Sequence, residues 1–298
     1  MDTNNTNKRT NKLLLVYASA FLAVMLWASA FPATRYALQY YSPVSLMVMR
    51  FTTASVTLGI IGIVKKIKLP ALKDLPLFAA SGLTGVFLYS YLFNTGSVSV
   101  SAGVSSFIIA SSPIFTLILT RIFLKEIVKP LCWIGVLISF CGLAAVTLTQ
   151  VTEFSFDLGV VLVICAALSS GAYSAIFRGL TRKYTALEAT TYTIITGTLG
   201  TLLFLPVAIR EIPQSNMIVN LIVLFMGVFP AAFAYLAWGY ALAKAKKTAH
   251  VTVFSYLIPF ISALLGFLWL RETISVMAFG GGLVIIAGMI LTNIFDRE

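Results

Sequence analysis

Ten long runs of apolar residues follow one another along the chain, separated by short breaks that contain charged residues, Pro, Asn or Gly. A helix that crosses a bilayer needs about 20 predominantly apolar residues, and each run has roughly that length. Little of the 298-residue chain remains outside them. The pattern predicts an all-α integral membrane protein with ten transmembrane helices, at about 13–34, 44–64, 74–96, 102–123, 131–149, 157–180, 186–209, 217–242, 249–270 and 274–294.

The composition excludes the main soluble classes of protein. Apolar residue types, counted with Tyr, Trp and Cys, make up 59% of the chain, and charged residues make up only 10%, against about 25% charged in soluble domains. A soluble domain with so few charges would expose too much apolar surface to water, and a disordered chain would be far less apolar.

The basic residues indicate the orientation of the helices. They lie in the breaks between apolar runs rather than on one solvated face, so we expect a lipid bilayer and no nucleic acid as partner. An even number of helices places both termini on one side. Because basic residues accumulate in cytoplasmic loops, we expect a multi-pass protein of the cell's inner (plasma) membrane with cytoplasmic N- and C-termini. The outward segments then hold only Arg35, Arg210 and Arg271, and the inward segments hold 17 basic residues: Lys8, Arg9, Lys12, Lys65, Lys66, Lys68, Lys73, Arg121, Lys125, Lys129, Arg178, Arg182, Lys183, Lys244, Lys246, Lys247 and Arg297.

The two halves of the chain, residues 1–150 and 151–298, are similar to each other. A shift of 146 residues pairs Trp27 with Tyr173, Phe31 with Phe177, Tyr89 with Tyr235, Pro113 with Pro259, Leu124-Lys125-Glu126 with Leu270-Arg271-Glu272, Gly135 with Gly281, and Gly142 with Gly288. Each half holds five predicted helices. Because five is odd, the second half is predicted to sit upside down in the bilayer, as two inverted five-helix repeats. Such repeats are characteristic of secondary transporters that work by alternating access.

At this point the chain resembles a known family, the EamA-type family of the drug/metabolite transporter superfamily. The resemblance rests on ten spans in two copies, a proline inside the fourth helix of each copy and a basic-Glu pair that closes that helix. It implies transport of small metabolites, often amino acids, whereas sibling families carry nucleotide sugars, sugar phosphates or drugs. The residues that carry it are Trp27-Ala28-Ser29-Ala30-Phe31, Ser42-Pro43, Arg50-Phe51, Pro113, Lys125-Glu126, Pro259 and Arg271-Glu272.

These features together favour a secondary transporter that moves a small polar metabolite, an amino acid or a related compound, by alternating access. An exporter of drugs or other hydrophobic compounds, or a channel, is the alternative. We expect no enzyme, because the chain has one His and no acidic residue near the centre of a span. No Cys/His spacing suggests a metal, and no GxxxxGK(S/T) loop suggests ATP hydrolysis. We expect a monomer or a homodimer with a small-molecule substrate.

Four aromatic residues are the first candidates for substrate binding. The inverted topology places Trp27 and Tyr89 beyond mid-depth toward the outside, and Tyr173 and Tyr235 toward the cytoplasm. We predict that these rings border a shared cavity at its two mouths, contact substrate and help to close the two gates. Ordinary packing and interfacial aromatics are the other interpretation.

The two mid-helix prolines define a second group of candidates. Pro113 and Pro259 each remove one backbone hydrogen bond and clash with the carbonyl four residues earlier, which predicts helix kinks. Freed backbone groups at membrane depth need protein or a watery cavity around them. A structural kink satisfied by neighbouring helices is the alternative. Side chains within one turn of the kinks are candidates for substrate contact: Ser111, Ser112, Ser255 and Tyr256.

Arg50 is the one charge predicted to lie well inside a span, about 10 Å along its helix at 1.5 Å per residue. A charge at that depth is costly and by default suggests function. It is predicted either to contact an anionic group of the substrate, or to pair with Glu272 or extend to the interface.

Overall fold

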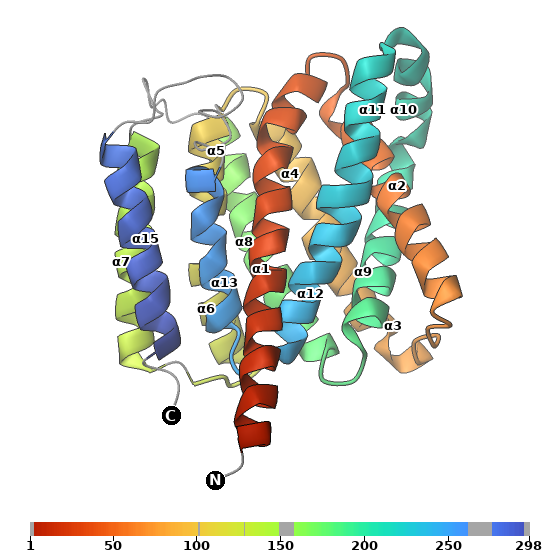
Figure 1. Ribbon diagram of the computed structural model, residues 1–298. Coiled ribbons are helices and arrows are strands. Elements are labelled where there is room, and N and C mark those ends of the chain that lie inside the picture. Colours follow the sequence, from red (N-terminus) through yellow and green to blue (C-terminus); the bar gives the residue numbers. More distant parts are fainter. Residues whose placement is uncertain (1–2, 101, 128, 149–157, 262–275, 295–298) are drawn as a thin grey trace.

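The computed structural model describes residues 3–100, 102–127, 129–148, 158–261 and 276–294, and all regular secondary structure in these ranges is helical (Figure 1). The helices run up and down roughly parallel to one another. The elements are α1 (Thr3–Ala37), α2 (Pro43–Val64), η1 (Leu72–Asp74), α3 (Leu75–Gly82), η2 (Leu83–Leu88), α4 (Tyr89–Gly96), α5 (Ala102–Ile109), α6 (Ser112–Phe123), α7 (Pro130–Leu148), α8 (Leu158–Leu180), α9 (Ala186–Thr201), η3 (Leu202–Phe204), α10 (Leu205–Glu211), η4 (Ile212–Gln214), α11 (Met217–Met226), η5 (Gly227–Phe233), α12 (Ala234–Lys244), α13 (Ala249–Thr252), η6 (Val253–Tyr256) and α15 (Val276–Ile294).

The lengths and hydropathies of these helices confirm a helical membrane protein. Among the described residues, seven helical stretches are long and apolar enough to cross a membrane: Leu13–Ala37, Pro43–Val64, Leu72–Gly96, Val104–Phe123, Leu158–Leu180, Ala186–Gln214 and Met217–Lys244. Three shorter apolar helices occupy the remaining predicted windows: Pro130–Ala145, Ala249–Ile261 and Phe279–Thr292. The count of ten spans stays a prediction.

The outer surface of the bundle carries the side chains that a bilayer requires. Large apolar residues on several helices point away from the protein, and Ile63 is 79% exposed and Val276 90% exposed. Exposed apolar surface on this scale would be unstable in water but matches lipid tails.

Helix starts follow local capping rules. Ser42 caps α2 with its side chain on the Ser45 amide, and Pro43 occupies the first turn, where no backbone donor is needed. Thr185 and Glu188 form a reciprocal capping box at the start of α9. With these caps, the segments that precede α2 and α9 end at defined residues, and the two helices begin there.

α7 and α15 form a tightly packed pair at one edge of the bundle (Figure 1). A Cβ atom on Gly135 would lie 2.7 Å from the Thr292 amide nitrogen, and one on Gly142 would lie 2.6 Å from the Gly281 carbonyl oxygen. Only glycine permits this approach of the two backbones, which small residues typically allow in membranes.

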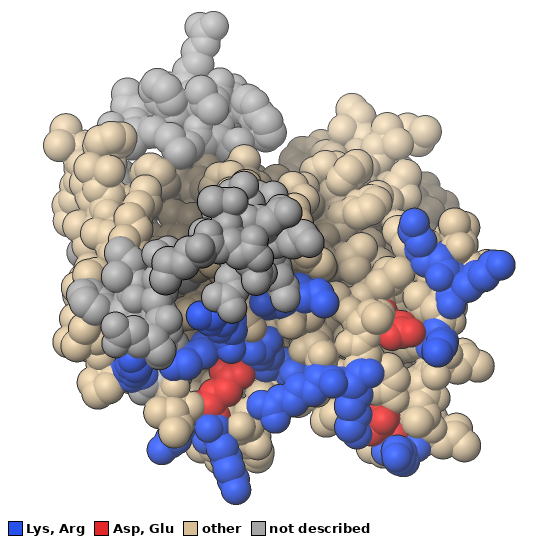
Figure 2. Space-filling model, turned by 60° about the horizontal axis from the view of Figure 1, so that its bottom comes forward, with Lys and Arg blue, Asp and Glu red and all other residues tan. Residues whose placement is uncertain are grey.

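One end of the bundle is strongly basic. Both termini lie at this end, where α1 begins and α8 ends, and Figure 2 shows Lys and Arg side chains gathered on this face with few acidic ones between them. Lys183, in the connection after α8, donates a hydrogen bond of 2.8 Å to Asp74. That carboxylate raises the pKa of Lys183 above its usual value.

Candidate functional site

A narrow cavity lies in the centre of the bundle, between helices of both halves. Its volume is about 50 Å³, room for a few water molecules, whereas pockets for metabolite-sized ligands typically measure about 300–1,000 Å³. The cavity is therefore contracted in this conformation. Its lining consists of Trp27, Ala30, Phe31, Thr34, Arg50, Gly85, Tyr89, Phe93, Ile109, Ser112, Thr116, Ser170, Tyr173, Ser174, Tyr235, Trp238, Thr252, Ser255 and Ile258.

Most of the residues predicted from the sequence meet at this cavity. It is lined by Trp27, Arg50, Tyr89, Ser112, Tyr173, Tyr235 and Ser255, which come from seven different elements. Ser111 and Tyr256 do not line it. Ser111 donates its hydroxyl to the Ile108 carbonyl at 2.6 Å, and Tyr256 is fully buried with its ring 6.4 Å from that of Phe140 in α7.

Several lining residues were missed by the sequence analysis. Trp238 and Phe93 lie one helical turn after Tyr235 and Tyr89, on the same helix faces. Thr116 and Thr252 likewise lie one turn from Ser112 and Ser255. These four residues could therefore have been identified in the sequence by their helical spacing from the predicted ones.

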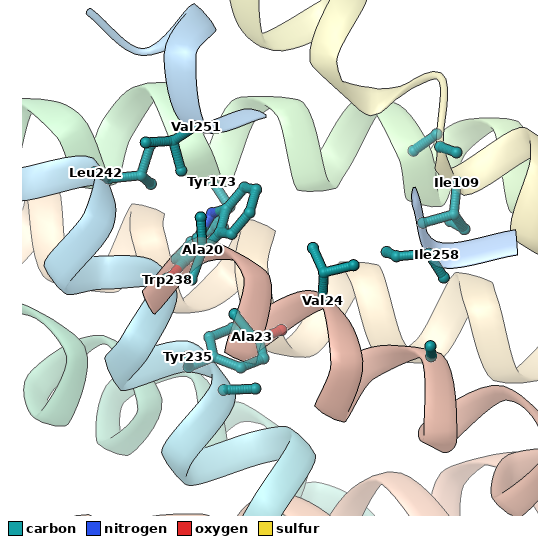
Figure 3. Close-up of a cluster of buried hydrophobic side chains, with 14 of the residues drawn as sticks. Ala20, Ala23, Val24, Ile109, Tyr173, Tyr235, Trp238, Leu242, Val251 and Ile258 are labelled. Carbon is teal, nitrogen blue, oxygen red and sulfur yellow. The ribbon is translucent and has the colours of Figure 1, made fainter. Parts of the chain in front are cut away.

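Four of the lining aromatic rings, those of Trp27, Tyr173, Tyr235 and Trp238, form one connected cluster. The ring centroids of Trp27 and Tyr235 are 5.6 Å apart, those of Trp27 and Trp238 5.0 Å, and those of Tyr173 and Tyr235 5.6 Å. Figure 3 shows Tyr173, Tyr235 and Trp238 beside α1, where the small side chains of Ala20 and Ala23 face them.

The rings of Trp27 and Tyr235, which we predicted at opposite mouths of the cavity, are in contact in this conformation. Two side-chain hydrogen bonds hold the cluster together. Trp27 donates its indole N–H to the Pro230 carbonyl at 3.0 Å, and Tyr235 donates its hydroxyl to the Gly85 carbonyl at 2.8 Å. Each bond joins one half of the chain to the other.

The acceptors of these bonds lie in two π-helical segments, η2 and η5. A π-helical turn widens the helix and is frequent at functional sites. Thr84 and Pro230 are equivalent under the 146-residue shift, and both of their carbonyls accept a side chain from the opposite half: Ser169 donates to Thr84 at 2.7 Å. The two segments precede Tyr89 and Tyr235 and set the directions of these rings.

Both prolines lie beside interruptions of their helices. α5 ends at Ile109, and Pro113 occupies the first turn of the new helix α6. Before Pro259, residues Val253–Tyr256 form the tighter 3₁₀ helix η6. The predicted kinks therefore take the form of local breaks, and Ile109 and Ser255, four residues before the prolines, line the cavity.

Arg50 brings a positive charge to the cavity wall. It is 6% exposed, and its guanidinium carbon lies 5.4 Å from the centroid of the Phe51 ring. Tyr89 and Tyr235 line the same cavity as Arg50. Glu272, the partner that the sequence suggested, lies outside the described residues.

Toward the end of the bundle that carries Arg35, two phenylalanines form part of the cavity wall. Phe31 and Phe93 pack edge to face with their centroids 5.5 Å apart. A smaller cavity of about 10 Å³ shares these two side chains and Thr34 with the central one, and it extends to Arg35. The pair thus separates the central cavity from a route to this end.

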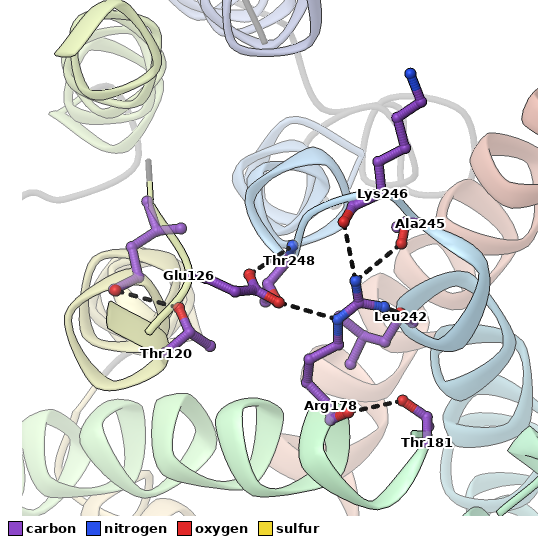
Figure 4. Close-up of polar contacts among 9 residues, drawn as sticks. Thr120, Glu126, Arg178, Thr181, Leu242, Ala245, Lys246 and Thr248 are labelled. Atoms are coloured by element: carbon purple, nitrogen blue, oxygen red, sulfur yellow. Dashed lines mark hydrogen bonds and ion pairs between the residues drawn. The ribbon is translucent and has the colours of Figure 1, made fainter. Parts of the chain in front are cut away.

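At the basic end, one arginine ties the two halves together (Figure 4). Arg178 of α8 pairs with Glu126, Nε to Oε1, at 3.1 Å. It also donates to the carbonyls of Leu242, Ala245 and Lys246. The second carboxylate oxygen of Glu126 accepts the Thr248 amide at 3.2 Å. The ends of α8, α12 and α13 are therefore held to the α6–α7 connection.

No group of three His, Cys, Asp or Glu side chains in the part of the chain that the structure covers could hold a metal ion.

Comparisons with known proteins agree with this architecture. A crystal structure of a protein superposes with a TM-score of 0.78 at 18% identity, covering 95% of this chain and 97% of that one, which shows the fold. The chain is 34% identical to a protein of Streptantibioticus cattleyicolor named a probable terminal-alkyne amino-acid exporter, covering 91% of each. It is 30% identical to the uncharacterized transporter YdfC of Bacillus subtilis, covering 94% of this chain and 92% of that protein.

The profile of the EamA-like transporter family matches the chain twice, over residues 14–148 and 157–294. Together these ranges cover almost all of the sequence, and the resemblance inferred from the residues is confirmed. The chain therefore belongs to the EamA-like transporter family and is a multi-pass membrane transporter rather than an enzyme.

Proposed function

We propose that the protein is a secondary transporter that moves a small polar metabolite, an amino acid or a related compound, by alternating access. The observation that carries the proposal is the central cavity lined by both halves of the chain. Four pairs of its lining residues are equivalent under the 146-residue shift: Trp27 and Tyr173, Tyr89 and Tyr235, Ile109 and Ser255, and Ser112 and Ile258.

Two further observations support an inverted repeat. The family profile matches each half separately. α1 begins at the basic end of the molecule, whereas α8, its counterpart in the second half, ends there (Figure 1). Two such halves can exchange conformations, so that the cavity opens first to one side and then to the other.

The same arrangement supports ten spans in the plasma membrane, with both termini in the cytoplasm. The basic face in Figure 2 is then the cytoplasmic one. In this orientation, the Arg178 network joins the two halves at the cytoplasmic end, and the Phe31–Phe93 pair lies between the central cavity and the outer side. The cavity of about 50 Å³ is too small for a metabolite-sized ligand, so transport requires it to widen. A monomer is sufficient for this mechanism, and a homodimer is compatible with it.

The amino-acid class is supported by the name of the Streptantibioticus relative. The aromatic lining favours the second candidate, an exporter of hydrophobic compounds, because Trp and Tyr rings bind apolar ligands well. A channel is disfavoured by the small volume of the central cavity, about 50 Å³.

Counterflow in liposomes tests the proposal. We expect proteoliposomes loaded with an unlabelled mixture of the twenty amino acids to accumulate at least one labelled amino acid transiently, with saturable kinetics. Replacing Tyr235 with Leu should impair this flux, because the hydroxyl bond to Gly85 is lost. Flux that never saturates and shows no counterflow would indicate a channel. Flux of hydrophobic dyes alone would indicate the drug exporter.

A further inference from the structure

We propose that Arg50 is the anion-binding group of the cavity, and that the substrate must carry a carboxylate while its amino group, where present, has no ionic partner. This inference rests on the transporter function proposed above and narrows its substrate class to small monocarboxylates, with amino acids as one subset.

The Arg50 side chain is buried and incompletely paired. The residue is nine-tenths buried, and its Nε atom has no hydrogen-bond partner among the described residues. The ion pairs in the described ranges are Arg178–Glu126 and Lys183–Asp74, and neither involves Arg50. A charged group at membrane depth is costly without a partner.

The composition of the cavity wall favours an anion. Among its described lining residues Arg50 is the sole charged side chain, and neither Asp nor Glu contributes. An anion that enters the cavity therefore meets one positive charge with no competing carboxylate. A guanidinium matches a carboxylate with two parallel N–H donors, which makes this pair stronger than a neutral hydrogen bond.

Other residues of the cavity wall carry phenolic hydroxyl groups. Tyr89 and Tyr235 both line the cavity, and the Phe51 ring contacts both the Arg50 guanidinium, at 5.4 Å, and the Tyr235 ring, at 6.1 Å. The Tyr235 hydroxyl proton is donated to the Gly85 carbonyl at 2.8 Å, whereas the Tyr89 hydroxyl belongs to a ring that lines the cavity wall. Tyr89 therefore supplies the cavity with a hydroxyl donor, from which an anion can accept a hydrogen bond. A single arginine neutralises a single negative charge, which favours a monocarboxylate over a doubly charged phosphate ester.

The absence of a lining acid has a consequence for the amino group. Among the described lining residues, an ammonium group would find aromatic faces and hydroxyls but no carboxylate, and cation–π contacts are modest in strength. Removing the carboxylate from a substrate should therefore matter more than removing its amino group.

Competition in the counterflow assay tests the inference. The probes are the twenty amino acids, their carboxamides and the corresponding acids without the amino group. In the wild-type protein, we expect the acids to compete about tenfold better than the carboxamides, a difference of about 1.4 kcal/mol, and the acids without an amino group to retain competition. Arg50→Gln should remove this preference, and Arg50→Lys should keep part of it.

Two controls separate the possible outcomes. Glu272→Gln should keep the preference for acids, and its loss in that variant would assign Arg50 to a structural ion pair and overturn the inference. Carboxamides that compete as well as acids in the wild-type protein would also overturn it, while leaving the transporter function intact. Absence of any amino-acid or carboxylate flux would contradict both proposals. The melting temperature of each variant without ligand shows whether it is folded.

Discussion

Replacing Gly85 with alanine should nearly abolish transport while leaving the protein folded. A Cβ atom at this position would lie 2.6 Å from Cγ of Tyr173. Tyr173 cannot retreat easily, because it is 3% exposed and packed between the rings of Phe177 and Tyr235 at 5.4 and 5.6 Å. Overpacking of this kind costs about 1–3 kcal/mol. The overpacking displaces side chains that line the cavity. We therefore expect the initial rate of counterflow to fall by about tenfold or more.

Gly59→Ala is the matched control for this substitution. Gly59 lies in α2, and a Cβ atom there would have no neighbour within 4 Å. The control should transport normally and melt at the same temperature or slightly higher, because alanine favours helix more than glycine does. Normal transport in Gly85→Ala would contradict the assignment of the Tyr173 ring to the substrate cavity.

Arg178→Ala should produce the largest loss of stability among substitutions of charged residues described here. The side chains of Arg178 and Glu126 are only 13% and 12% exposed. The substitution leaves the Glu126 carboxylate with the Thr248 amide and leaves three carbonyls without their donor. Breaking a buried ion pair by removing one partner costs about 3–5 kcal/mol. We expect a clear fall in melting temperature of the purified protein in detergent.

Further variants define the physical origin of that loss. Arg178→Lys should rescue little, because an ammonium group cannot contact the carboxylate and three carbonyls with the geometry of a guanidinium fork. Arg178→Ala combined with Glu126→Gln should lose less than the two single losses together, since the second change removes the unpaired charge. Arg182→Ala, at an exposed position one turn further on, is the control. Equal melting temperatures for Arg178→Ala and Arg182→Ala would show that the network contributes no net stability.

The network also explains one of the sequence motifs in physical terms. Lys125 adopts a left-handed backbone conformation, with φ of 55°, directly after α6 ends. Such a residue closes a helix C-terminus and turns the chain sharply. The turn presents Glu126 to Arg178 at 3.1 Å. In the first half, the Lys-Glu pair therefore acts as a helix stop followed by a contact between the halves.

The positions of the helices were largely predictable from the sequence. The windows 44–64 and 157–180 agree within one residue with α2 and α8. This agreement has a simple cause: bilayer thickness sets the length of each apolar run, and charged residues cannot remain within it. The meeting of Trp27, Arg50, Tyr89, Ser112, Tyr173, Tyr235 and Ser255 at one cavity could also be anticipated, because the repeat pairs most of these positions.

The contacts within the site could not be predicted in the same way. Hydropathy does not distinguish a π-helical turn from an α-helical one, so η2 and η5 left no signal in the sequence. The direction of the Tyr235 ring depends on η5 and on a carbonyl 150 residues away in the chain. The edge-to-face contact with Trp27 follows from that direction and not from the depth of either residue in the membrane.

Because of the π-helical segments, the side chains that form the cavity wall depend on the number of residues in each segment. A π turn holds one residue more than the α turn it replaces, and neighbouring residues of an α-helix are rotated by about 100°. Deleting a single residue from Leu83–Leu88 would thus swing Tyr89 and the rest of its helix by about that angle, away from Arg50. A related carrier that keeps every aromatic residue but has one residue more or fewer before them would line its cavity with a different set of side chains. Selectivity in this architecture can change through insertion and deletion as well as through substitution.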